Sequence, residues 1–296
     1  MIHRMVLSWL PWVVAAALAA VAVARQVRMS EHDTLLDEHA RRRTAPDRVS
    51  TPTAWRRVTR DVLDGAPRAL DRLDAHVAQR PDRRQDAVDL LLICLRSGVA
   101  RGLNAAWRTE VQDRLRAHLS PGPGFWPGMA LRAAGATLVE LDLSGCRPGS
   151  IDLTGAVFLG DARLRAMTVT GPATFAQARF LRHADLADTL FTADADLTGA
   201  VLTGNAVLRG VRVAGATSLA GARVSGRADL SGAELTGPAD FTGARFGGRA
   251  LFTGTTFGHD ARFDRVWFRG RTDVTSALVG DTASFTDARF GRRVPR

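Results

Sequence analysis

The side chains that most often form catalytic or metal sites are those of histidine, cysteine, aspartate and glutamate. In this sequence they show none of the spacings that such sites require. None of the histidines forms the His-Glu-x-x-His pair of a zinc protease, and no three share a ligand spacing. Cys94 and Cys146 belong to different segments, so neither a disulfide framework nor a cysteine metal site is indicated. The seven histidines are His3, His32, His39, His76, His118, His183 and His259.

The compact triplet Glu31-His32-Asp33 is the nearest approach to a chemical grouping. Adjacent residues on a helix point in different directions, so a solvated surface explains this triplet better than a site does. Ser144-Gly145 and Ser231-Gly232 read as turns rather than nucleophile elbows, and the sequence contains no phosphate-binding loop. The sequence therefore predicts a protein that is not an enzyme and has no cofactor or metal.

A large apolar residue recurs at alternating intervals of five and six positions through the second half of the chain. From Ala222 to Phe268 it stands at Val224, Leu230, Leu235, Phe241, Phe246, Phe252, Phe257, Phe263 and Phe268. A small or β-branched residue lies two positions before each, and glycine is common two positions after. A helix needs a period near 3.6 and an ordinary strand needs 2, so this period indicates a solenoid whose units bury their apolar faces by stacking.

The repeat resembles the pentapeptide-repeat family, whose motif is roughly Ala, Asp or Asn, then Leu or Phe, then two variable residues. Ala184-Asp185-Leu186 and Ala239-Asp240-Phe241 match it literally. The resemblance implies a mainly β fold, a right-handed quadrilateral parallel β-helix. Two faces take five and six residues, so a coil of four faces takes 22 residues. Equivalent residues of successive coils therefore lie 22 positions apart in the sequence. Residues 138–292 would then form about seven coils. Leu138 and Leu143 would form a first, broken turn, with Pro148 in place of the next large residue.

The segment from Met5 to Ala24 is an unbroken run without a charged side chain. As a helix this run would be about 30 Å long, enough to span a bilayer, so we expect a transmembrane anchor over residues 1–25. A signal peptide cleaved near Val23 or Arg25 is the alternative. Basic residues are more numerous after the run than before it, which places the C-terminal domains in the cytoplasm; export is the alternative.

Residues 26–120 show helical periodicity. Trp55, Val58 and Val62 share one face of a helix that Gly65 should end, and Leu70, Leu73 and Val77 line the next. Further helices are predicted over Gln85–Arg96 and Trp107–Leu119. Residues 121–137 are rich in proline and glycine and would serve as linker and cap, with Phe125 and Trp126 against the first coil. The order of the segments, with an anchor first, then a helical stretch and then the repeats, resembles that of membrane-anchored actinobacterial members of the family. A tail of residues 293–296 would follow the repeats.

Residues spaced 22 apart predict a basic ridge on the outer wall of the solenoid. Every basic residue other than histidine is arginine, which is typical of GC-rich coding sequence, so the net charge of +10 is weak evidence for nucleic acid. The ridge is either a solvated face that an arginine-rich chain tolerates or a surface for an acidic partner, which could be a protein, anionic lipid head groups or nucleic acid. We refer below to the following eight residues as the arginine ridge: Arg179, Arg223, Arg227, Arg245, Arg249, Trp267, Arg271 and Arg289.

Three functions follow from these patterns. The first is a non-catalytic, membrane-tethered scaffold for protein–protein interaction, with its solenoid in the cytoplasm. The second, implied by relatives that modulate DNA gyrase by mimicking DNA, requires a strongly acidic surface. Residues 136–296 hold 19 arginines against 16 acidic residues, which disfavours that function. The third is an exported protein of the cell envelope.

Membrane topology gives the first test. A reporter that is active only in the cytoplasm, fused after Arg296, should be active because the positive residues after the apolar run hold the C-terminal side inside. An N-terminus of the mature protein near Val23 or Arg25, found by N-terminal sequencing, would instead establish export and overturn the anchor.

Overall fold

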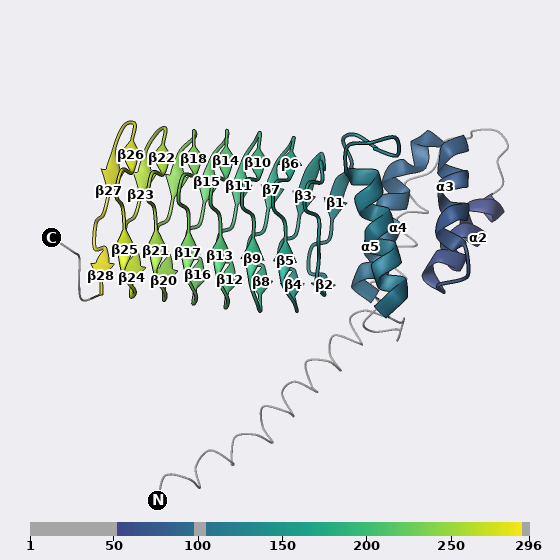
Figure 1. The fold of residues 1–296 in the computed structure, drawn as a ribbon, viewed down its shortest axis with the longest axis horizontal. Helices are drawn as coiled ribbons and strands as arrows, with labels where there is room; N and C mark the ends of the chain where they lie inside the picture. Colours follow the sequence, from purple (N-terminus) through teal and green to yellow (C-terminus); the bar gives the residue numbers. More distant parts are fainter. Residues whose placement is uncertain (1–51, 98–104, 292–296) are drawn as a thin grey trace, which may run out of the picture. The chain divides into compact units, whose positions relative to one another are not determined.

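The structure is a computed structural model that describes residues 52–97 and 105–291. Figure 1 shows a group of helices followed by a stack of short strands. The predicted anchor at 1–25, the helical residues up to 51 and the tail at 293–296 lie outside the described residues. Within the described ranges, no helix is both long enough and apolar enough to cross a bilayer.

The helices of the described ranges follow the predicted apolar stripes. They are α2 (Pro52–Leu63), α3 (Ala69–Gln79), the 3-10 turn η1 (Pro81–Arg83), α4 (Arg84–Ser97) and α5 (Ala105–Leu119). Leu70, Leu73 and Val77 are buried on α3, and Gly65 follows α2 with a φ of 67° that other residues adopt only at a cost. The helical periodicity of the sequence is therefore confirmed for these segments.

The strands form four parallel sheets, which we call faces 1 to 4 in the order in which the chain visits them. Face 1 contains β1 (Ala130–Arg132), β3 (Ser150–Asp152), β7 (Ala173–Thr174), β11 (Ala195–Asp196), β15 (Thr217–Ser218), β19 (Ala239–Asp240), β23 (Ala261–Arg262) and β27 (Ala283–Ser284). Face 2 contains β2 (Thr137–Leu138), β4 (Val157–Phe158), β8 (Arg179–Phe180), β12 (Val201–Leu202), β16 (Arg223–Val224), β20 (Arg245–Phe246), β24 (Trp267–Phe268) and β28 (Arg289–Phe290).

Faces 3 and 4 complete each coil. Face 3 contains β5 (Ala162–Arg163), β9 (Ala184–Asp185), β13 (Ala206–Val207), β17 (Ala228–Asp229), β21 (Ala250–Leu251) and β25 (Thr272–Asp273). Face 4 contains β6 (Thr168–Val169), β10 (Leu190–Phe191), β14 (Arg212–Val213), β18 (Glu234–Leu235), β22 (Thr256–Phe257) and β26 (Leu278–Val279). The chain thus forms a parallel β-solenoid of about seven turns, as the repeat predicted.

The first coil is shorter than the coils that follow it. Arg223 pairs with Arg245, one full repeat later, whereas Ala130 pairs with Ser150 and Thr137 with Val157, each across a shorter stretch of chain. The segment around Pro148 has no strand of its own but still accepts hydrogen bonds from the coil that follows. The N–H of Thr170, directly after β6, donates to the carbonyl of Pro148 at 3.3 Å. Strand β1 therefore lies inside the segment 121–137 that the sequence assigned to a linker, and the solenoid begins earlier than residue 138.

The large residue of each repeat points inward and is buried. Phe252 is 2% exposed, and Ala250, two positions earlier on the same face, has no exposed surface. Equivalent rings stack from coil to coil: Phe241 lies 4.7 Å from Phe263, and Phe246 lies 5.1 Å from Phe268. The core is thus a continuous ladder in which each side chain is covered by its neighbours above and below.

Helix α4 covers the open edge of β1 at the N-terminal end of the stack. The side-chain amide of Gln85 donates to the carbonyl of Ala130 at 2.8 Å and accepts the N–H of Ala130 at 2.8 Å. The amide therefore makes the two hydrogen bonds that a further strand would make. On α5, Gln112 likewise accepts the N–H of Asp142 at 3.2 Å. These contacts satisfy backbone groups that an uncovered edge would leave open.

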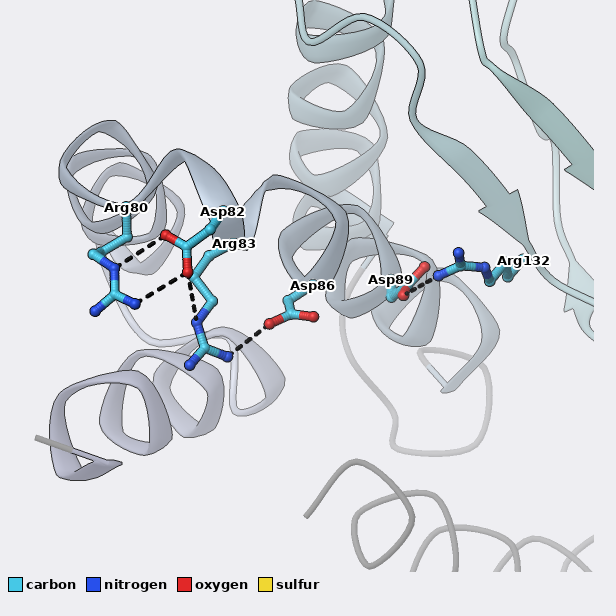
Figure 2. A network of polar contacts seen from close by, with 6 residues as sticks. All are labelled: Arg80, Asp82, Arg83, Asp86, Asp89 and Arg132. Carbon is cyan, nitrogen blue, oxygen red and sulfur yellow. Dashed lines mark hydrogen bonds and ion pairs between the residues drawn. The ribbon is translucent and has the colours of Figure 1, made fainter. Parts of the chain in front are cut away.

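Charged pairs reinforce this cap along the start of α4. Figure 2 shows Arg83 between Asp82 and Asp86, with the Arg83–Asp86 pair at 2.7 Å, and Arg132 of β1 reaching Asp89 at 3.1 Å. The last pair joins a helix to the first strand of the solenoid. The helical segment and the solenoid therefore form one packed unit.

A buried polar cluster fixes the chain between α5 and β1. His118 on α5 lies 2.9 Å from a carboxylate oxygen of Asp74 on α3 and 3.1 Å from the carbonyl of Gly124. Its ring stacks on Trp126 with centroids 3.5 Å apart, and Arg114 pairs with the other oxygen of Asp74. Trp126, expected against the first coil, thus contacts the helix that precedes it. Burial raises the pKa of Asp74, but hydrogen bonds from His118 and Arg114 outweigh it and leave the pKa lowered.

Replacing Phe252 by Asp should destabilise the solenoid by at least about 4 kcal/mol, because the change removes a buried ring and places an unpaired charge among apolar side chains. Thermal unfolding followed by circular dichroism measures the loss. The matched control is Leu181→Asp, since Leu181 lies on the outer wall; its effect should stay within about 0.5 kcal/mol. Equal effects of the two substitutions would contradict the inward position of Phe252.

The lowered pKa of Asp74 predicts a dependence of stability on pH. Because the ionised form is favoured in the folded state, Asp74 stabilises the protein above its ordinary pKa of 3.8, and this stabilisation is lost as the pH falls through the lower, folded-state value. Asp74→Asn should cost about 1–3 kcal/mol at pH 7 and less at pH 3. Chemical denaturation of both proteins at the two pH values measures this, and an equal cost at both would contradict the ionised pair.

Candidate interaction ridge

The arginine ridge occupies two neighbouring columns of the solenoid. One column runs along the outer surface of face 2, where the pairing of β8, β12, β16, β20, β24 and β28 stacks successive residues. The other runs along the corner before face 3, where one residue of each coil precedes β9, β13, β17, β21 and β25. The structure therefore brings together the two sets that the sequence predicted from their 22-residue spacing.

The face 2 column places like charges next to each other. Arg223 pairs directly with Arg245, and Arg245 with Trp267. Arg179 lies at one end, separated from Arg223 by Val201, and Arg289 follows Trp267 at the other. All four arginines and Trp267 are exposed. With a strand spacing of about 4.8 Å, the guanidinium groups of Arg223 and Arg245 are within reach of one extended partner.

The corner column begins with His183 and Asn205, whose side chains accept hydrogen bonds from the backbone of the next coil. The Asn205 N–H donates to Nδ1 of His183 at 3.0 Å, and the Arg227 N–H donates to Oδ1 of Asn205 at 3.0 Å. A short polar side chain at this corner thus satisfies an N–H that the strands leave open. Arg227, Arg249 and Arg271 continue the column with side chains in solvent.

Two of the corner arginines are paired with carboxylates, which the sequence analysis missed. Arg227 contacts Asp229 at 2.7 Å, and Arg249 contacts Asp273 at 3.3 Å. Burial raises the pKa of Asp229, yet hydrogen bonds from Ser231 and the charge of Arg227 leave it lowered. A hydrogen bond from Thr275 is the main cause of the lowered pKa of Asp273. The corner column is therefore less positive than its arginines alone would make it.

Glycines occupy the position just before the corner column in four successive coils. Gly204, Gly226, Gly248 and Gly270 hold this position, and a Cβ added to Gly226 would lie 2.5 Å from the carbonyl oxygen of Gly204. Larger residues are disfavoured there because the backbones of adjacent coils approach too closely. The other position between the two columns carries side chains, among them Ser225.

Exposed apolar and basic residues that the sequence analysis passed over lie between the two columns or in line with that strip. Leu159 and Leu181, which follow the large residue of face 2, are 41% and 39% exposed, and Arg269 holds the same position near the end of the solenoid. The 22-residue spacing of this position could have indicated these residues from the sequence. The strip between the columns is thus apolar near the start of the solenoid and basic near its last coils.

The described residues show no chemical centre. Within 52–97 and 105–291, no three His, Cys, Asp or Glu side chains are grouped so that they could hold a metal ion. Cys94 and Cys146 are both buried, and burial raises the pKa of the Cys146 thiol, which disfavours the reactive thiolate. The triplet Glu31-His32-Asp33 lies outside the described residues. The described surface of the solenoid instead carries ordered rows of charged side chains.

Comparison with known families agrees with this architecture. A family model for pentapeptide repeats, nine copies long, matches residues 153–201, 197–245 and 219–267. These matches lie within the part of the solenoid that has the 22-residue register, which continues to the pairing of Phe268 with Phe290. No curated protein matches the chain.

Proposed function

We propose that this chain, which is a pentapeptide-repeat protein, is a non-catalytic scaffold tethered to a membrane, and that its arginine ridge binds an acidic segment of a partner protein. The observation that carries the proposal is the direct pairing of Arg223 with Arg245 beside exposed Trp267. Three side chains suited to binding a carboxylate-rich chain follow one another along one wall.

Electrostatics supports an acidic partner. Exposed like charges about 5 Å apart repel by roughly 1 kcal/mol in water, and less in salt. The fold tolerates this cost, and an acidic segment along the column would convert the repulsion into charge-assisted hydrogen bonds. Trp267 adds an aromatic surface of the kind that is enriched at protein interfaces.

The position of the ridge on an outer wall favours a peptide or protein over a small molecule. Small ligands bind in concave sites that bury most of their surface, whereas the ridge residues are exposed along the outside of face 2 and its corner. An extended segment can follow the columns, contacting one guanidinium per coil.

The membrane tether rests on the uncharged run Met5–Ala24, whose length suits a single span. A tether would hold the ridge near the inner membrane surface and restrict it to partners found there. Export to the cell envelope remains the alternative, and the topology experiment above separates the two.

Modulation of DNA gyrase is the second function to test. The balance of 19 arginines against 16 acidic residues in 136–296 does not resemble the phosphate backbone that a DNA mimic must imitate. A supercoiling assay with purified gyrase should therefore show no inhibition by this protein.

Replacing Arg223, Arg227, Arg245 and Arg249 together by Gln tests the ridge. Binding of a fluorescent peptide rich in Asp and Glu should weaken at least about tenfold, since two exposed and two partly neutralised guanidinium groups are lost. The free energy of unfolding should fall modestly, by about 1–2 kcal/mol, because the pairs of Arg227 with Asp229 and of Arg249 with Asp273 are lost while the repulsion between Arg223 and Arg245 is removed. Fluorescence anisotropy measures binding, and thermal unfolding measures stability.

The control removes exposed arginines elsewhere. Arg262→Gln with Arg265→Gln, on face 1 and its corner, should leave peptide affinity within about twofold. Affinity for the parent protein should fall as salt rises from 50 to about 300 mM. Binding that is independent of salt and survives the quadruple change would rule out the ridge, and the helical segment would become the next surface to test.

A further inference from the structure

Four residues follow one another along the outer surface of face 2 in the middle of the solenoid. Val201 pairs with Arg223, Arg223 with Arg245, and Arg245 with Trp267. Val201 is half-buried, whereas Arg223, Arg245 and Trp267 are exposed. We call Arg223 and Arg245 the arginine pair. Because adjacent strands lie about 4.8 Å apart, the column presents an apolar, two basic and one aromatic side chain at even intervals.

The surface around the arginine pair carries no acidic residue of its own. Face 2 and its two corners are formed in these coils by residues 198–205, 220–227 and 242–249, which contain no Asp or Glu. On neighbouring face 3, the carboxylate of Asp229 is held by Arg227 at 2.7 Å. Like charges directly opposite each other on adjacent strands are destabilising, so the arginine pair creates a local site that favours an anion.

Two adjacent guanidinium groups suit one phosphate monoester better than one carboxylate. A carboxylate has a single charge and two oxygens, which one arginine satisfies with two parallel N–H groups. A phosphate monoester carries nearly two negative charges at neutral pH and has three strong acceptor oxygens. A phosphate that lies between Arg223 and Arg245 can therefore accept a bidentate contact from each of them and neutralise both charges.

The residues at the two ends of the column indicate what lies on either side of that phosphate. A phosphorus centred between Arg223 and Arg245 is one and a half strand spacings, about 7 Å, from both Val201 and Trp267 along the column. In an extended peptide, side chains on one side recur every two residues, which is also about 7 Å. Apolar side chains two positions before and after a phosphorylated residue would therefore reach Val201 and Trp267.

The positions immediately beside the arginine pair carry small residues. Gly221 and Gly243 precede face 2 in these two coils, and Ser225 and Gly247 follow it. The φ values of Gly221 and Gly243 are 67° and 69°, which residues with a Cβ adopt only at a cost. An extended peptide along the column can therefore bring its main chain close to both guanidinium groups.

We infer that the arginine pair binds the phosphate of a phosphorylated serine or threonine in an extended segment of a partner protein. Apolar residues two positions to either side of the phosphorylated residue then contact Val201 and Trp267. This binding deepens the proposed function and rests on it, since it specifies the acidic segment. Arg227 and Arg249 contribute less, because their guanidinium groups are already paired with carboxylates.

Fluorescence anisotropy with the full-length chain in mild detergent, at about 150 mM salt, provides the test. The probe is a short labelled peptide of Gly and Ser with a central phosphoserine and a Leu two positions to either side. It should bind at least about tenfold more tightly than the unphosphorylated peptide, and about fivefold more tightly than a peptide in which two Glu residues supply the same charge. Moving both Leu residues next to the phosphoserine should weaken binding about threefold.

Substitutions on face 2 separate the two parts of the contact. Arg223→Gln and Arg245→Gln should each weaken phosphopeptide binding at least about tenfold and bring it within about twofold of the Glu peptide, because one guanidinium cannot supply both bidentate contacts. Arg245→Lys should also weaken binding, since an ammonium group has no fork. Trp267→Ala should cost about threefold with the Leu peptide and nothing with a peptide that has Gly in place of Leu.

The matched control is Arg262→Gln, which removes an exposed arginine of face 1 that stacks between Asp240 and Ser284. It should leave phosphopeptide affinity within about twofold. Thermal unfolding of every variant shows whether the fold is kept.

A Glu peptide that binds as tightly as the phosphopeptide would overturn the phosphate site and leave the acidic-segment function standing. Failure of both peptides to bind the parent would overturn both. Displacement of the phosphopeptide by an equal concentration of glycerol phosphate would show that phosphate binds without the peptide. Equal competition by a short single-stranded oligonucleotide, compared per phosphate, would assign the site to nucleic acid. Either result overturns the inference.

Discussion

Every coil of this protein depends on the coil next to it. A single coil has four large inward side chains and two-residue strands, too little to bury a core or to satisfy its own backbone. Stacking supplies both at once: the ring of Phe263 is covered by Phe241 below, and parallel hydrogen bonds join each face to its successor. Stability is then nearly a sum of nearest-neighbour terms, and damage at one coil is felt most by the coils it touches.

The same dependence makes the ends of the stack the critical positions. At the first coil, helix α4 supplies a side-chain amide where a strand would be, and an ion pair between Asp89 and Arg132 ties it to β1. The shortened first coil brings β1 within reach of that amide. The last described coil has the opposite character, since its inward residues remain open.

Strict stacking also shapes the surface. A residue type that recurs every 22 positions becomes a column about one strand spacing apart, so a modest bias in sequence yields an ordered row of charge. The net charge of that row depends on whether carboxylates lie close enough to pair with its arginines. Arg223 and Arg245 project from a face and remain exposed, while Arg227 and Arg249 turn toward Asp229 and Asp273. The proposed binding surface therefore has its charge concentrated on face 2.

Spacing along the chain was enough to predict the repeat, the inward residues from Leu153 to Phe268 and the column order of the arginine ridge. Each of these depends on one relation, in which a residue 22 positions on lies directly above. The apolar stripes that α3 and α5 bury likewise indicated the helices.

Contacts between segments of different spacing could be found only in the folded chain. The start of the solenoid at β1 depends on Gln85 of α4, which no periodicity connects to Ala130. The neutralisation of Arg249 depends on the carboxylate of Asp273 in the next coil. The exposure of Phe285 depends on the layer that follows it, and its residue type is the same as that of buried Phe263. Spacing fixes which residues share a column, whereas packing against unlike elements decides which of them are covered, paired or open.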